Sequence, residues 1–189
     1  MKETLPQSST EDASQEQLAP QGVGMAVAFD WGLAVQIFVT PILLIFFGLN
    51  PGAVGIDTGS TVAKMLYFVV SWPFAALLWL YGEMVRSGRN WARRVQVAAN
   101  ILLTIAGIAD LYNLYRGIKS GNYWSLVTEI ILLIFSPLIA WRMSRPSTAR
   151  WFKTVSPDEA RKRHGGWWIV FIALWALVGG ILQAIAASK

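Results

Sequence analysis

The most regular feature of the sequence is a series of five long apolar runs separated by short polar segments. The runs cover residues 29–49, 62–81, 95–115, 124–141 and 167–187. About 20 residues of α-helix, each rising about 1.5 Å, cross the roughly 30 Å hydrocarbon core of a bilayer. Backbone polar groups inside a bilayer must bond within their own segment, which favours helices. The pattern therefore predicts an all-α fold, an integral membrane helical bundle of five transmembrane helices.

The N-terminal segment differs sharply from these runs. Residues 1–26 are polar and rich in Ser, Gln, Glu and Pro, which is typical of disordered chain. They do not resemble a cleavable signal peptide, because a positive start is missing and the segment is acidic at Glu11, Asp12 and Glu16. We therefore expect a disordered tail, followed by one membrane domain over residues 27–189.

A longer basic segment, residues 142–166, lies between the last two runs and is expected to lie at the membrane surface. Within it, Ser156-Pro157-Asp158-Glu159 has the pattern of a capping box, in which Ser caps a helix and Glu reaches back to the cap. Gly165-Gly166 is suited to end that helix. The segment is thus expected to hold one or two helical turns.

The basic residues predict the orientation of the bundle. With five spans, residues 1–28, 82–94 and 142–166 share one side, and they carry twelve of the sixteen Lys and Arg residues. Lys and Arg are retained on the cytoplasmic side. The N-terminus should therefore be cytoplasmic and the C-terminus outside. Eight basic side chains of these loops are candidate contacts for lipid headgroups: Arg89, Arg93, Arg94, Arg150, Lys153, Arg161, Lys162 and Arg163.

Composition agrees with a membrane location and excludes several kinds of site. Of the 189 residues, 54% are hydrophobic and 14% are charged, against about a quarter charged in soluble domains. Cysteine is absent and His164 is the only histidine, which excludes thiolate metal sites, iron–sulfur clusters and bis-histidine haem. We expect no cofactor and no metal. The net charge of +5 reflects basic clusters beside apolar runs, so nucleic acid is not an expected partner.

Two acidic residues lie more than one helical turn inside the predicted spans, where a charge is costly and by default suggests a function. Asp110 and Glu129 should meet at similar depth, since the third and fourth runs form an antiparallel hairpin. On the third run, Asn100 and Thr104 share the face of Asp110, which predicts a polar seam between the two helices. The seam has two interpretations. It is either a proton or cation path, or a structural feature in which the acids pair with Arg116 and Lys119 or reach the interface.

Other features of the runs concern packing. Pro41, Pro73 and Pro137 lie inside spans and predict kinks. In the fifth run, small residues at four-residue spacing predict a helix interface, inside the protein or with another subunit: Ala176, Gly180 and Ala184. Seven of the ten tryptophans cluster at the predicted cytoplasmic boundary, which is typical of an interfacial aromatic belt: Trp31, Trp79, Trp91, Trp141, Trp151, Trp167 and Trp168. A pocket for a pigment or quinone is the alternative use of these rings.

Three segments, SGRNWARR (87–94), SPLIAWRMSRP (136–146) and TARWF (148–152), resemble a loose class of small, uncharacterised bacterial polytopic membrane proteins. The resemblance implies a bacterial inner membrane. No phosphate loop, nucleophile elbow or zinc motif is present, so we do not expect an enzyme. The sequence favours a non-catalytic accessory or scaffolding subunit, in contact with membrane lipids and with partner subunits or further copies of itself. The alternative is a small proton- or cation-coupled transporter or channel using the carboxylate pair.

Overall fold

The structure is a computed structural model, and it describes residues 19–47, 61–119 and 125–163, all of whose regular elements are helices. Three of these helices are long and apolar enough to cross a membrane: α2 (Gln21–Phe47), α3 (Thr61–Arg86) and α4 (Asn90–Lys119). The fourth expected span is helical over α5 (Ser125–Ile130), the π-helical turn η2 (Ile131–Phe135) and α6 (Ser136–Ser144). The fifth expected span, with Ala176, Gly180 and Ala184, lies outside the described residues.

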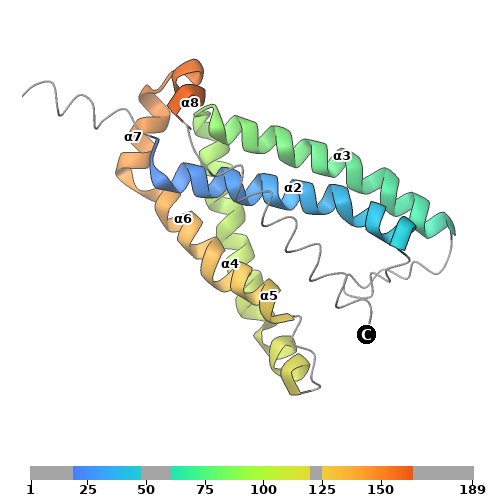
Figure 1. Cartoon of the computed structure of the whole chain (residues 1–189). Coiled ribbons are helices and arrows are strands. Elements are labelled where there is room, and N and C mark those ends of the chain that lie inside the picture. The colour runs from blue at the N-terminus through green and yellow to red at the C-terminus, as the bar shows by residue number, and fades with distance from the viewer. Residues whose placement is uncertain (1–18, 48–60, 120–124, 164–189) are drawn as a thin grey trace, which may run out of the picture.

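The helices form two antiparallel pairs. Figure 1 shows α2 and α3 side by side, and α4 running beside α5 and α6 in a second arm that projects away from the first. The short helices α7 (Pro146–Thr154) and α8 (Pro157–Arg163) lie where the two arms meet. We call this junction the basic end. The opposite tip, formed by α5 and the last turns of α4, is called the hairpin end. Helix α2 begins at Gln21, so part of the segment expected to be disordered is helical.

The turn between α3 and α4 is built by one glycine. Gly88 has a φ of 72°, the left-handed conformation in which glycine carries no steric penalty. Its N–H donates to the Val85 carbonyl, and the N–H of Arg89 donates to the Met84 carbonyl. These two bonds form a Schellman motif, which satisfies carbonyls at the end of α3. The close approach of Gly88 to Val155 then holds the turn against the end of α7.

The three prolines that were expected to kink their helices have different local structures. Pro41 and Pro73 lie inside the uninterrupted helices α2 and α3. Before Pro137 the chain instead adopts a π-helical turn, and the N–H of Ser136 donates to the carbonyl of Ile131, five residues back. Because proline lacks an N–H and clashes with the carbonyl four residues earlier, a widened turn relieves this position without ending the helix.

The expected capping box at the start of α8 is confirmed. The Ser156 N–H donates to Glu159 Oε2 at 3.3 Å, and the Glu159 N–H donates to Ser156 Oγ at 3.4 Å. Helix α7 was not expected as a separate element. It buries Trp151 and Phe152 in a core shared with Val85 and Met143, so this part of the basic segment is packed into the protein.

Candidate functional site

The main polar feature of the interior is Asp30 on α2. It is the second residue of the first apolar run, and no role was predicted for it from the sequence. Because α2 begins nine residues earlier, Asp30 lies within a helix that packs against α3 and α6, and its side chain is 4% exposed. A buried carboxyl group is costly unless it is hydrogen-bonded or neutralised. Its surroundings therefore define the first candidate site.

The partner of Asp30 comes from α4. Gln96 Nε2 donates to Asp30 Oδ1 at 3.0 Å, and Asn100 Nδ2 donates to the main-chain carbonyl of Gln96 at 2.8 Å. All three side chains are buried, and we call them the polar centre. Within the described part of the chain, Asp30 Oδ2 and Asn100 Oδ1 accept no hydrogen bond. The polar centre thus has two oxygen acceptors with no donor among the described residues.

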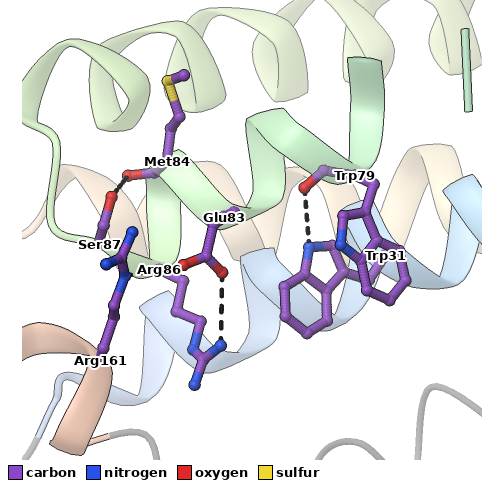
Figure 2. Close-up of polar contacts among 7 residues, drawn as sticks. All are labelled: Trp31, Trp79, Glu83, Met84, Arg86, Ser87 and Arg161. Atoms are coloured by element: carbon purple, nitrogen blue, oxygen red, sulfur yellow. Dashed lines mark hydrogen bonds and ion pairs between the residues drawn. The ribbon is translucent and has the colours of Figure 1, made fainter. Parts of the chain in front are cut away.

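Tight contacts with α3 fix the helix that carries Asp30. Trp31 Nε1 donates to the Trp79 carbonyl at 3.1 Å, and the two indole rings stack with centroids 4.4 Å apart (Figure 2). Gly82 makes this possible, because a Cβ at that position would lie 2.5 Å from the Trp31 ring. Trp31 is thus a core residue, as is Trp151, whereas Trp79, Trp91 and Trp141 have exposed rings. The expected aromatic belt therefore applies at most to part of the tryptophan set.

Charged residues link the elements of the basic end. Glu83 on α3 pairs with Arg86 at 3.4 Å and with Arg161 of α8 at 3.0 Å (Figure 2). Arg93 on α4 donates to the Met143 carbonyl at 3.0 Å and to Asn90 Oδ1 at 3.1 Å. Arg93 is thus used by the fold, although the sequence suggested a lipid contact.

The other expected headgroup contacts differ in their availability. Five of them are exposed and have no ion pair with another described residue: Arg89, Arg94, Arg150, Lys153 and Lys162. Arg161 is exposed but paired with Glu83, and the side chain of Arg163 lies outside the described set. Exposed basic side chains therefore lie on α7, α8 and the start of α4, where the sequence predicted headgroup contacts.

The expected polar seam begins at the polar centre and continues along α4. Thr104 Oγ1 donates to the Asn100 carbonyl at 2.8 Å, so each polar residue bonds to the turn before it. Gly107, on the same face, is packed against η2, and a Cβ there would lie 2.6 Å from Leu132 Cβ and 3.0 Å from Leu133 Cδ2. The seam is therefore interrupted by a close apolar contact one turn beyond Thr104.

The acid pair, Asp110 and Glu129, lies beyond this contact. The two carboxyl groups are close enough to interact directly, as expected for the antiparallel hairpin. Asn113 Nδ2 donates to Asp110, while neither carboxyl oxygen of Glu129 accepts a hydrogen bond from a described residue. Asp110 is fourteen residues from Gln96, which is about 21 Å along the helix axis. The polar centre and the acid pair are two separate acidic positions.

The described residues contain no group of three or more His, Asp or Glu side chains able to hold a metal ion. Searches with protein-family models, curated proteins and solved structures find no match for the chain. The interpretation therefore depends on the geometry of the molecule.

Proposed function

We propose that the protein is a non-catalytic accessory subunit of a bacterial inner-membrane complex, with its N-terminus in the cytoplasm. The observation that carries this proposal is the outer face of α3. Apolar side chains that are more than half exposed recur along it at helical spacing: Val62, Met65, Leu66, Val69, Val70, Phe74, Leu77 and Leu80. Such a face requires lipid or another apolar surface.

A groove beside this face favours a protein partner over lipid alone. It lies between α2 and α3, has a volume of about 440 Å³, and is lined by small and aromatic side chains: Ala34, Val35, Phe38, Trp72, Ala75, Ala76 and Trp79. Small residues let the backbone of another helix come close, which is how helices associate in membranes. The stacked rings of Phe38 and Trp72, with centroids 4.9 Å apart, form one rigid wall.

A photo-crosslinking residue at Leu77 tests the proposal. Leu77 is 65% exposed on α3, and Val85 on the same helix is fully buried, so the same substitution at Val85 is the control. We expect Leu77 to yield an adduct of defined higher mass, from another protein or a second copy, and Val85 to yield none. Adducts with lipid only, together with recovery of single chains by native mass spectrometry in mild detergent, would contradict the proposal.

A second candidate function, proton or cation transport, has one observation in its favour. Gln96, Asn100, Thr104 and Asp110 line one face of α4 and connect two acidic positions. The contact of Gly107 with Leu132 and Leu133 closes this line, so transport requires a second conformation in which α4 and η2 separate. A liposome flux assay distinguishes the two functions. The subunit proposal predicts no flux above protein-free liposomes, and a flux abolished by Glu129→Gln would favour transport.

A further inference from the structure

A small cavity lies at the basic end, and none of its lining residues takes part in the Glu83 ion pairs. It has a volume of about 280 Å³ and is formed where the first turn of α2, the end of α6 and the start of α7 meet (Figure 1). The residues that matter for its chemistry are Gly22, Trp141, Arg142, Arg145, Ser147 and Thr148. No carboxylate is among the described residues that line it. The cavity is therefore lined by two arginines and by hydroxyl-bearing residues.

The two arginines give the cavity its ligand preference. The guanidinium of Arg145 lies over the Trp141 ring, with its central carbon 4.0 Å from the ring centroid. This stacking restricts a long side chain that would otherwise be mobile. Arg142, one turn earlier on the chain, also lines the cavity. Arginine binds phosphate through two parallel N–H bonds, so a pair of arginines at one cavity suits a tetrahedral oxyanion.

The backbone adds to this preference. Helix α7 starts at the cavity, no side chain caps its N-terminus, and its first turn holds no acidic residue. Thr148 Oγ1 is used to bond the Arg142 carbonyl at 2.9 Å, which fixes α7 against α6. The first turn of α2 also lacks an acidic residue. Two helix N-termini with their partial positive charges thus meet beside the arginines.

The position of the cavity limits the source of the anion. The apolar span of α2 begins at Gly22, and the apolar stretch Ile131–Ser144 ends beside Arg145. The cavity therefore lies where apolar helix surface gives way to polar residues, the depth at which phospholipid phosphates lie in a bilayer. Gly22 allows α2 to reach this level beside α6, since a Cβ there would lie 2.8 Å from Arg142 Cβ.

We propose that this cavity binds the phosphate of an anionic phospholipid headgroup. The proposal concerns residues other than the exposed basic side chains of the surface, and it does not depend on the subunit function. Arg145 holds the phosphate oxygens, Arg142 lines the same site, and the Ser147 hydroxyl and the amides of the first turn of α7 complete it.

Native mass spectrometry of the detergent-solubilised full chain tests the proposal with two lipids that have the same acyl chains. Phosphatidic acid carries the phosphate and diacylglycerol does not. We expect selective retention of phosphatidic acid, reduced about tenfold by Arg145→Gln because a charge-assisted pair of bonds is lost. Arg150→Gln is the matched control, since Arg150 is an exposed residue of α7 that does not line the cavity, and should change retention less than about twofold.

Four results would overturn the proposal. Equal retention of the two lipids would show that the phosphate is not recognised, and equal losses in both variants would show that only general charge matters. Selective retention that appears only after Glu11, Asp12 and Glu16 are changed to amides would mean that the N-terminal tail occupies the cavity. Inorganic phosphate distinguishes the source of the anion. We expect no displacement at equimolar concentration, and full displacement would contradict a lipid ligand.

Discussion

Asp30 and Glu129 have almost the same exposure, 4% and 3%, but the protein covers them in different ways. Asp30 lies at the basic end among packed helices, where Gln96 of α4 donates to its carboxyl group. Glu129 lies in the arm of two helices that projects away from α2 and α3, beside a second acid and without a described hydrogen-bond donor (Figure 1). The comparison teaches that burial alone does not identify the polar residues that organise a membrane bundle. Such residues are identified by the hydrogen bonds that they form with distant segments of the chain.

The largest expected effect concerns the contact that holds α2 in place. Gly82→Ala inserts a methyl group 2.5 Å from the stacked Trp31 ring, which its hydrogen bond and Trp79 keep from moving. Gly24→Ala is the control, because nothing lies within 4 Å of its Cβ position. Both changes gain the same helix propensity, so their difference isolates the clash. We expect Gly82→Ala to be about 1–3 kcal/mol less stable than Gly24→Ala by urea unfolding in detergent. Equal stability would mean that α2 and α3 are not in close contact.

Removal of the Asp30 carboxyl group should have the next largest effect. Asp30→Leu leaves the buried amide of Gln96 without its acceptor, which costs about 1–3 kcal/mol of unfolding free energy. Asp30→Asn keeps an acceptor oxygen and should cost much less. If Asp30→Asn were as damaging as Asp30→Leu, the charge of Asp30, and not its hydrogen bond, would be the stabilising feature.

A smaller effect is expected at Arg93, whose bonds join α4 to α6. Arg93→Gln loses the bond to the Met143 carbonyl and should lower the unfolding free energy by about 1 kcal/mol. Arg94→Gln, next to it and exposed, removes the same charge without that bond and should change stability by less than about 0.5 kcal/mol. If the two substitutions lowered the unfolding free energy equally, Arg93 would stabilise the protein through its charge and not through its hydrogen bond.

The smallest effect is expected at the hairpin end. Glu129→Leu removes a carboxyl group that accepts no hydrogen bond from the described residues and lies beside Asp110. The unfolding free energy should therefore not fall by more than about 0.5 kcal/mol, and a small gain is expected because an unbonded buried carboxyl group is removed. A loss comparable to that of Asp30→Leu would show that the acid pair has structural partners of its own.

The sequence predicted those features that depend on neighbouring residues. The apolar runs 62–81 and 95–115 lie within α3 and α4, and the capping box forms as expected. The face of α4 that carries Gln96 and Asn100 is buried, as its helical spacing indicated. Hairpin symmetry also predicted that Asp110 and Glu129 would meet.

The features that the sequence did not predict depend on segments far apart in the chain. The role of Asp30 was not predicted, because its donor, Gln96, is 66 positions away on α4. Arg93 looked like a free basic residue because its acceptor is a main-chain carbonyl 50 positions away. Every residue has such a carbonyl, so the sequence does not show which one Arg93 binds. Trp31 looked interfacial because hydropathy does not reveal that Gly82 opens a space for its ring. A hydropathy pattern reports how apolar a segment is, but not which distant side chain covers it.

A double-mutant cycle between Asp30 and Gln96 tests most directly the claim that these residues form the polar centre of the bundle. The unfolding free energies of Asp30→Leu, Gln96→Leu and the double variant are compared with that of the unchanged protein in the same detergent. The account predicts a coupling energy of about 0.5–1.5 kcal/mol, with the double variant more stable than the sum of the single losses implies. Additive losses, within about 0.3 kcal/mol, would contradict it.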